Sequence, residues 1–214
     1  MKKITAIIIL CVFLCSDAFA RSVSYKGGWT ILTANDEDSD SLYIHYSPKA
    51  DYSVGCKGEY FRDRKYVVSL GQLNVLVKRW NMPGWQANVY VKSGVGGAVT
   101  ADNASNVSGA PALMSAFAAD WENRRYYLSY EAQMLYAGKI DFRCTQKGRA
   151  GIAPYIGEYG DVHTWLMAEV RYEPTRKNDK FMVTPLIRFF KGTILAEAGA
   201  DYKGNVMFNW AMYF

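Results

Sequence analysis

The amino-acid sequence predicts an all-β protein, a single closed antiparallel transmembrane β-barrel of about twelve strands, with about ten or eight as alternatives. Three observations support this fold class. Apolar and polar residues alternate with the two-residue period of a strand, and no convincing helical stripe occurs. After residue 20 no stretch is apolar for about 18 residues, so a membrane-spanning chain would have to cross with strands closed into a barrel. The aromatic fraction of 15% suits a barrel with aromatic girdles.

The first twenty residues have the features of a secretory signal peptide. Lys2 and Lys3 precede an apolar run over 4–14, and Ala18-Phe19-Ala20 forms a small-residue cleavage site. The run is too short to cross a bilayer as a helix, which needs about 20 apolar residues. We therefore expect residues 1–20 to be removed after Ala20 and residues 21–214 to form the barrel.

Two cysteines, Cys56 and Cys144, remain after the signal peptide. An even number of cysteines in an exported chain raises the option of a disulfide. The two residues lie four strands apart in the predicted barrel. We therefore expect both to be free and to act as small apolar side chains.

Turn-forming residues divide the chain into alternating segments. An even number of strands places both chain ends on the periplasmic side, where the connections are short. The connections at the opposite side, such as acidic 35–40 and Gly-rich 96–110, are on average longer and more charged. The predicted strands are 25–33, 42–46, 52–61, 66–80, 85–95, 113–121, 125–143, 150–158, 162–173, 180–190, 193–200 and 205–214.

The segment 125–143 is the longest predicted strand. Its alternation is unbroken over its whole length, whereas strands of soluble domains have roughly 5 to 6 residues. Such a length suits a tilted strand that crosses a bilayer and projects beyond it. Pro154 and Pro185 fall inside predicted strands, where a closed barrel has no edge that tolerates a missing N–H. A strand bulge or a shifted boundary would accommodate each of them.

The final ten residues, 205–214, form an amphipathic strand that ends on an aromatic residue. This segment resembles the C-terminal signature of bacterial outer-membrane β-barrel proteins. The resemblance implies a location in the outer membrane of a Gram-negative cell, with outer-membrane lipid around the barrel. It also implies that the barrel-assembly machinery recognises the apolar face formed by Val206, Phe208, Trp210, Met212 and Phe214.

The polar faces of the predicted strands would place charged side chains inside the barrel. Cations outnumber carboxylates on these faces, which favours a water-filled passage for small anions. The alternative is that the charges pair across the lumen and plug it. The pore-lining candidates are Lys57, Glu59, Lys78, Lys92, Arg125, Glu131, Arg143, Glu169, Arg171 and Arg188. The same faces also carry Asp120, Lys139, Asp141 and Glu197.

His45 and Ser47 lie on one face of a predicted strand, where a His-x-Ser pair could set a base beside a nucleophile. The stretch containing His45, Tyr46 and Ser47 is similar to the His-Tyr-Ser segment of the outer-membrane lipid A deacylases. That family carries its segment near the C-terminus, whereas this one falls on the second strand. We treat a lipid-modifying hydrolase as an alternative, and an ordinary lumen or rim histidine as the simpler interpretation.

The sequence therefore favours a narrow, porin-like channel for small, anionic solutes over an enzyme. A structural or surface-exposed barrel without transport is the further alternative. We expect no cofactor and no metal site. We also expect no nucleic-acid partner, because no basic cluster with interleaved stacking aromatics occurs.

Overall fold

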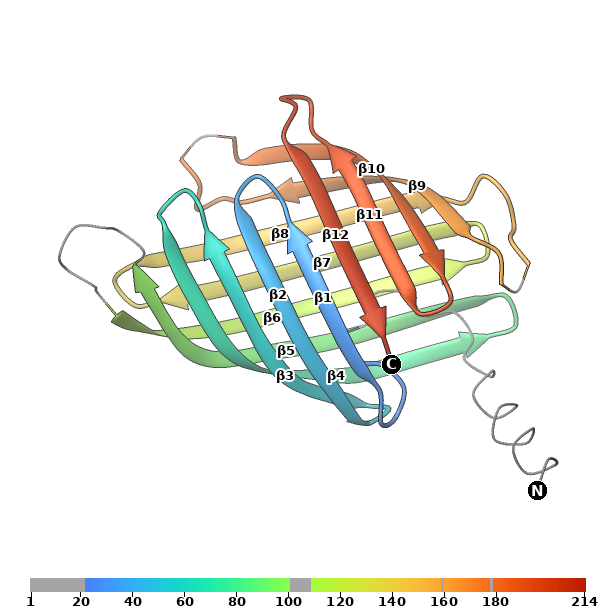
Figure 1. Cartoon of the computed structure of the whole chain (residues 1–214), viewed down its shortest axis with the longest axis horizontal. Helices are drawn as coiled ribbons and strands as arrows, with labels where there is room; N and C mark the ends of the chain where they lie inside the picture. The colour runs from blue at the N-terminus through green and yellow to red at the C-terminus, as the bar shows by residue number, and fades with distance from the viewer. Residues whose placement is uncertain (1–21, 101–108, 159, 178) are drawn as a thin grey trace, which may run out of the picture.

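The protein forms a closed antiparallel β-barrel (Figure 1). The computed structural model describes residues 22–100, 109–158, 160–177 and 179–214, so the predicted signal peptide lies outside the described residues. Each strand pairs with its neighbours in sequence, and the first strand pairs with the last to close the barrel. The predicted fold class is confirmed. The strands are β1 (Trp29–Asn35), β2 (Ser39–Lys49), β3 (Tyr52–Phe61), β4 (Tyr66–Met82), β5 (Trp85–Thr100), β6 (Gly109–Asn123), β7 (Tyr126–Ala137), β8 (Asp141–Ile152), β9 (His163–Tyr172), β10 (Phe181–Lys191), β11 (Ile194–Ala200) and β12 (Val206–Tyr213).

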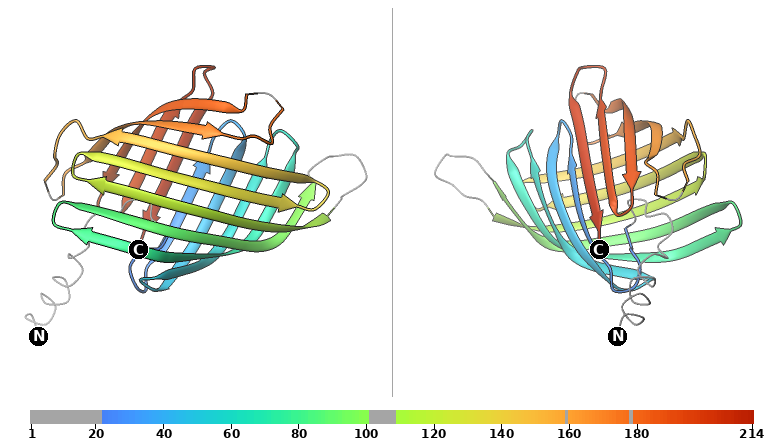
Figure 2. Two further views of the ribbon diagram at one scale, coloured as in Figure 1. Left: turned by 180° about the vertical axis from the view of Figure 1, so that it is seen from behind. Right: turned by 45° about the vertical axis from the view of Figure 1, so that its right-hand side comes forward.

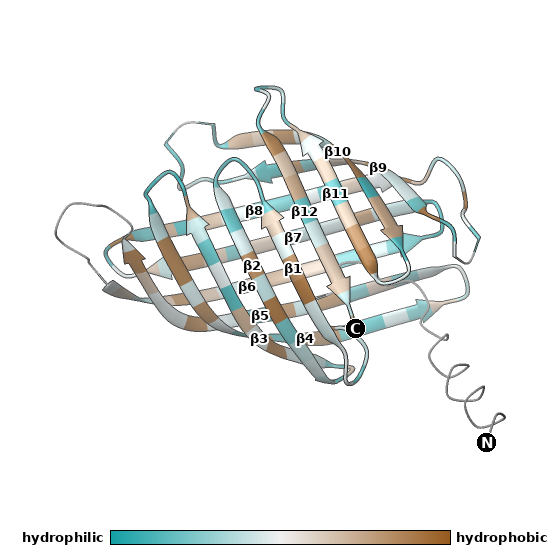
Figure 3. Cartoon of the chain, in the orientation of Figure 1, coloured by the Kyte–Doolittle hydropathy of each residue, from teal (hydrophilic) through white to brown (hydrophobic). Residues whose placement is uncertain are grey.

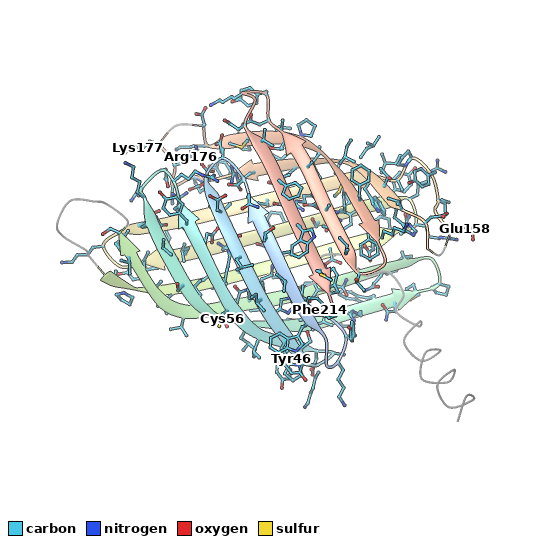
Figure 4. All side chains as sticks on the ribbon, viewed as in Figure 1. Tyr46, Cys56, Glu158, Arg176, Lys177 and Phe214 are labelled. Carbon is cyan, nitrogen blue, oxygen red and sulfur yellow. The ribbon has the colours of Figure 1, made fainter. Side chains whose placement is uncertain are left out.

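The barrel is flattened, and the strands of its two broad walls cross steeply (Figures 1 and 2). We call the end that carries the C-terminal residue Phe214 the terminal end, and the opposite end the loop end. The connections β1–β2, β3–β4, β7–β8, β9–β10 and β11–β12 lie at the loop end. Figure 4 shows Arg176 and Lys177 at the loop end, and Tyr46 and Phe214 at the terminal end.

The alternation of the sequence becomes two chemically different walls. Large apolar side chains such as Phe117, Leu128 and Phe208 point outward, and each is about half exposed. Polar side chains such as Asn74 and Arg188 point inward and are each 1% exposed. Figure 3 shows this alternation along the strands. A soluble monomer rarely exposes so much contiguous apolar surface, so the outer wall requires an apolar environment.

The predicted strand 125–143 is wrong, because it is a hairpin. β7 ends at Ala137 and β8 begins at Asp141, with Gly138 between them in the left-handed region at φ +55°. Ala137 pairs with Asp141, so odd-numbered residues face inward on both sides of this three-residue turn. The polar–apolar alternation therefore continues through the turn without interruption. For this reason the sequence pattern did not indicate the turn.

The predicted strand 150–158 is also wrong. β8 begins earlier than predicted and ends at Ile152. The chain between Ile152 and Val162 is a long connection at the terminal end, and Pro154 falls in it. Pro185 does lie within β10, where it pairs with Ala168 of β9. The ladder from β10 to β11 begins at Leu186, so Pro185 stands just beyond that ladder.

Three other boundaries differ from the predicted ones. β1 begins at Trp29 rather than residue 25, and the preceding residues fold against the barrel interior. β2 extends through Pro48 to Lys49, with a register shift between Tyr46 and Lys49. The predicted connection 96–110 is shorter, because Gly96 to Val99 pair with Ala112 to Gly109 in β5 and β6. Its centre, 101–108, lies outside the described residues.

The two cysteines are free, which confirms that prediction. Cys56 is exposed on the outer wall and Cys144 is partly buried. Within the described residues, no helix has the length and apolar character needed to cross a membrane.

The inside of the barrel is not polar throughout. An apolar cluster lines the inner face of β3 to β7 and fills part of the lumen with side chains. Its most deeply buried members include Tyr66, Val68 and Leu135. The polar part of the interior is therefore confined to the remaining space. The cluster comprises Phe61, Tyr66, Val68, Leu70, Ala98, Ala112, Met114, Ala116, Leu135 and Ala137.

Candidate functional site

The candidate functional site is an internal cavity of about 300 Å³, to which all twelve strands contribute lining side chains. The lining extends from Ser22, near the terminal end, to Asp36 and Asp38 in the β1–β2 connection at the loop end. Charged residues of both signs line it in equal numbers among the described residues. The cations are Lys57, Lys92, Arg143, Lys147, Arg149, Arg171 and Arg188, and the carboxylates are Asp36, Asp38, Glu59, Asp120, Glu131, Glu173 and Glu197.

This balance differs from the excess of cations expected from the sequence. A pore that selects anions needs an uncompensated positive charge along its wall. Here the lining carries as many carboxylates as cations, and most of them form ion pairs. The cavity is therefore polar without a strong net charge.

A network of buried ion pairs lies on β8 to β12. Arg149 donates to Glu169 at 2.7 Å through Nε and reaches both carboxylate oxygens of Glu197 at 3.2 Å. Arg188 donates to Glu197 at 2.6 Å, and Asn209 donates to the same carboxylate at 2.7 Å. These contacts follow from strand register, because Arg149 opposes Glu169, and Glu197 opposes both Arg188 and Asn209. Removing one member would leave an uncompensated buried charge.

An aromatic ring completes this cluster. The guanidinium carbon of Arg188 lies 4.7 Å from the ring centroid of Tyr127, within the range of a cation–π contact. The Tyr127 ring also meets Trp165 edge-on, with their centroids 6.2 Å apart. Arg188 is thereby fixed on the cavity wall.

On the opposite side, charges pair within and across the strands. Lys57 and Glu59 of β3 form an ion pair at 2.7 Å. Lys92 of β5 reaches over the inner face of β6 to Glu131 of β7. This ion pair therefore joins two strands of the same wall.

The acidic β1–β2 connection folds over the loop end of the cavity as a lid. Asp36 and Asp38 each lie 2.8 Å from the guanidinium of Arg171 on β9. Arg176, in the β9–β10 connection, pairs with Glu37 at 2.9 Å and with Asp38 at 3.0 Å. Asp38 is only 6% exposed. We call the segment Asp36, Glu37 and Asp38 the acidic lid.

The neighbours of Asp36 keep it ionised. Burial alone would raise the pKa of its carboxyl, but Lys147, Arg171 and the backbone N–H groups of Ser39 and Asp38 outweigh burial. The pKa of Asp36 therefore lies below its ordinary value of 3.8. The acidic lid accordingly carries this charge at neutral pH.

A second cluster lies beside the acidic lid around Arg143. Its guanidinium pairs with Asp141 at 2.8 Å and with Glu173 at 3.0 Å, and stacks 4.5 Å from the Phe61 ring centroid. It also contacts Asp63 in the β3–β4 connection. Burial raises the pKa of the Glu173 carboxyl above its ordinary value of 4.5. Arg143 thus links three loop-end segments.

The residues just before β1 close the terminal end. Val23 is completely buried and packs with Leu76, Tyr90 and Ala118, which belong to β4, β5 and β6. It follows Ser22, which lines the cavity, and it covers the inner wall at that end. We call residues 22–26 the N-terminal seal.

Hydrogen bonds fix the N-terminal seal to the wall. The carbonyl oxygen of Ser22 accepts from Ser53 Oγ at 2.7 Å and from Asn74 Nδ2 at 3.0 Å. The backbone N–H of Ser24 donates to Ser47 Oγ at 3.0 Å. The seal is thus held by β2, β3 and β4.

Most of the predicted pore-lining residues face the interior. Glu169 is 4% exposed and lies in the ion pair with Arg149 rather than on the main cavity wall. The predicted residues that line the cavity are Lys57, Glu59, Lys92, Glu131, Arg143, Arg171 and Arg188. Whether any solute passes them is a separate question, and their role in a pore stays a prediction.

The expected inward position of Lys78 is corrected. A β-bulge shifts the register between Leu76 and Lys78, and beyond it the two faces of β4 exchange. Lys78 is therefore exposed on the outer wall, with its ammonium 5.9 Å from the ring centroid of Trp80. Arg79 faces inward instead and donates to Asn88 at 2.7 Å.

The expected inward position of Arg125 is also corrected. Arg125 is an exposed residue of the turn between β6 and β7, and its carbonyl accepts the N–H of Ala153 at 2.9 Å. Lys139 similarly lies exposed, in the turn between β7 and β8. Arg125 lies just before the start of β7, and Lys139 lies in the turn that interrupts the predicted strand 125–143, so neither side chain belongs to the inward face.

His45 and Ser47 face the interior, as one strand face requires, but their surroundings do not resemble an active site. Ser47 is fully buried, and its Oγ accepts the hydrogen bond from the Ser24 N–H beneath the N-terminal seal. His45 stacks on Tyr43, with ring centroids 4.9 Å apart. A lipid chain has no access to this pair from the outer wall.

Sequence reasoning missed several residues of the site. Lys147 and Arg149 had been placed in a connection, although they continue the odd-numbered inward face that begins in β7. Gly138 was the signal for the missed turn. The acidic lid and the N-terminal seal gave no periodic signal, because neither is a strand. Among the described residues, no group of three or more His, Cys, Asp or Glu side chains is arranged to hold a metal ion.

Comparison with known proteins adds a remote likeness among solved structures. No protein-family model matches the sequence, and no curated protein matches it. Among solved structures, the chain is similar to "OmpT (in-vitro folded), an outer membrane protein of Vibrio cholerae", with 10% sequence identity and a TM-score of 0.30. The match covers 94% of this chain and 99% of that one. At this TM-score the likeness carries no argument about this protein.

Proposed function

We propose that this protein is an outer-membrane β-barrel that forms a narrow, normally closed conduit for small polar solutes. The observation that carries the proposal is the charged cavity, which extends from the N-terminal seal to the acidic lid inside a closed barrel. The apolar outer wall and the even number of strands support the membrane assignment. Selectivity for anions, expected from the sequence, finds no support in the balanced lining.

The two covers explain why the conduit rests closed. At the terminal end, Val23 packs on the inner wall against Tyr90 and Ala118, and hydrogen bonds hold its neighbours Ser22 and Ser24 to β2, β3 and β4. At the loop end, the acidic lid is held by Arg171 and Arg176. Because the contacts at both ends are separate from the barrel ladder, they can open without breaking the sheet.

The test changes one residue in each cover. Val23→Asn places an amide in the apolar contact, and Arg176→Gln removes two ion pairs of the acidic lid. Loss of a charge-assisted contact of about 1.5–3 kcal/mol shifts a closed–open equilibrium roughly tenfold or more. We expect the double variant to show at least about tenfold more channel openings in planar bilayers than the wild type, and more than either single variant.

Lys26→Asn is the matched control, because it also introduces an asparagine into the N-terminal seal, but at an exposed position. It should leave the current at the wild-type level. Heat-modifiable gel migration verifies that each variant is folded. A folded double variant that passes no current would exclude the conduit and favour a structural barrel whose ion pairs plug the lumen.

The lipid-modifying hydrolase has less support. Ser47 is buried beneath the N-terminal seal, away from both the lipid and the cavity lining. A folded wild-type protein that released fatty acid from phospholipid, and lost this activity in Ser47→Ala, would reverse that judgement.

A further inference from the structure

Two neighbouring charges of opposite sign are the most accessible members of the cavity's ion pairs. The side chain of Glu131 is 33% exposed and that of Lys147 is 35% exposed. The other paired charges on the cavity wall are between 1% and 19% exposed, as Arg188 and Arg149 illustrate. A solute in the cavity would therefore meet Glu131 and Lys147 first.

The strand register places these two side chains together. Glu131 on β7 directly opposes Lys147 on β8, and opposed residues have Cβ atoms about 4.5–5.5 Å apart. The Lys147 ammonium lies 4.0 Å from Asp36 Oδ2, beyond hydrogen-bond distance. Lys92 of β5 contacts Oε2 of Glu131 from the same wall, over the inner face of β6. The wall thus presents an ammonium and a carboxylate side by side.

The opposite wall carries buried polar atoms without partners. Thr30 Oγ1, His45 Nδ1 and Gln72 Oε1 have no hydrogen-bond partner among the described residues. All three residues line the cavity and are at most 8% exposed. They lie in one row, because Thr30 opposes His45, and Gly55 opposes both His45 and Gln72. Buried polar groups normally have partners, so this row indicates a polar occupant of the cavity.

We propose, on the basis of the proposed conduit, that the cavity binds a small zwitterionic solute of the α-amino-acid type. Its carboxylate pairs with Lys147 and its ammonium with Glu131, and its remaining polar atoms face the row formed by Thr30, His45 and Gln72. The volume of about 300 Å³ is at the lower end of ligand sites, which suits a solute of this size.

A singly charged solute fits this wall less well. An anion at Lys147 would also face Glu131 and Asp36, and a cation at Glu131 would face Lys147 and Lys92. Each would leave one member of the neighbouring pair uncompensated. A zwitterion satisfies both, which is the physical basis of the expected selectivity.

The experiment compares three probes of similar size: L-alanine, propionate and ethylammonium. Binding is measured by titration calorimetry on the full chain in detergent micelles, with the wild type and with the Val23→Asn/Arg176→Gln variant, whose covers are weakened. We expect L-alanine to bind at least about tenfold more tightly than either singly charged probe. Lys147→Met and Glu131→Gln should each weaken L-alanine binding by about tenfold or more.

Lys203→Met is the matched control, because Lys203 pairs with Asp179 in the loop-end connections, away from the cavity. It should bind L-alanine as the wild type does. If the two cavity variants lose their fold, the charge exchange Lys147→Glu with Glu131→Lys retains an opposed pair and should retain binding. Equal affinity for propionate and L-alanine, or no binding of L-alanine by the folded protein, would overturn the proposal.

Bilayer recordings on the same preparations separate this inference from the proposed conduit. Selective L-alanine binding without current in the opened variant would support the binding site and exclude the conduit. Current without selective L-alanine binding would retain the conduit and exclude the zwitterion site.

Discussion

Gly55 shows how a single residue position decides whether the barrel wall can close. A Cβ atom built on Gly55 would lie 2.2 Å from the carbonyl oxygen of Ile44 and 2.6 Å from Cα of His45. Both contacts are to backbone atoms of β2, the neighbouring strand. A side chain there cannot be relieved by a rotamer change, so β2 and β3 would have to separate.

We expect Gly55→Ala to destabilise the folded barrel by at least about 1–3 kcal/mol, the usual range for overpacking. Gly58→Ala, on the same strand, should have little effect, because a Cβ there meets no atom within 4 Å. The measurement is the temperature at which the heat-modifiable band unfolds on a gel. Equal unfolding temperatures for the two variants would contradict the close approach at Gly55.

Lys78 and Arg79 illustrate at the same scale why the site was only partly predictable. Alternation assigns Lys78 to the inner face, and up to Leu76 that assignment is correct for β4. A single extra residue then exchanges the faces, so Arg79 rather than Lys78 points inward. A bulge depends on pairing with β5, which the residues of β4 do not reveal.

The acidic lid is an element whose contacts depend on pH. Burial favours the neutral form of Asp36, but Lys147 of β8, Arg171 of β9 and the backbone N–H groups of Ser39 and Asp38 together outweigh burial and hold its pKa below 3.8. A carboxyl with a lowered pKa contributes stability above its ordinary pKa and loses it as pH falls through the lowered value. The lid contacts of Asp36 are therefore complete at neutral pH and break only in strong acid.

We expect the current through the Val23→Asn variant to stay constant from about pH 8 to about pH 5, and to rise only below the ordinary carboxyl range. Asp36→Asn, which removes the charge at every pH, should raise the current at neutral pH. The measurement is channel opening in planar bilayers across this pH series. A rise already at about pH 6 would show that another group controls the lid.

The β7–β8 hairpin marks the limit of periodicity at the level of elements. Pattern alone assigned its inward face correctly, including Glu131 and Arg143. It could not find the turn. Ala137 and Asp141 are paired across a three-residue turn, so odd-numbered residues face inward both before and after it. Lys147 and Arg149 were consequently placed in a connection, although they are central to the cavity.

At the scale of the whole molecule, the last strand serves two purposes. Its backbone closes the barrel, since Phe214 and Trp29 exchange N–H to C=O hydrogen bonds at 2.9 and 3.0 Å. Its outward face, formed by Val206, Phe208, Trp210, Met212 and Phe214, is the surface that we propose for recognition by the barrel-assembly machinery. The Phe214 side chain is half exposed and is free to take part in such recognition.

We expect Phe214→Ala to reduce the amount of folded protein in the outer-membrane fraction several-fold, because the substitution removes the terminal ring and leaves the backbone pairing intact. Tyr202→Ala is the control, since this aromatic residue is 71% exposed in the β11–β12 connection. Fractionation followed by heat-modifiable gel migration measures both variants. Normal assembly of Phe214→Ala would contradict a role for the terminal aromatic residue.

The sequence by itself determined the class of the fold and, for most strands, which residues face inward. This is possible because strand periodicity is local: a residue and its second neighbour share a face, and an apolar outer wall makes that face visible in the sequence. Most of the charged interior follows from this rule.

The tertiary structure alone decided what the interior contains. The equal numbers of charges around the cavity, the seal by Val23 and the lid formed by Asp36 and Asp38 all depend on contacts between segments far apart in the chain. Neither cover has a periodic sequence pattern. The bulge in β4 exchanges the inward and outward faces of that strand, and the turn at Gly138 divides one predicted strand into two. Register and chain folding, rather than composition, therefore replaced the expected excess of inward cations with equal numbers of both signs around the cavity.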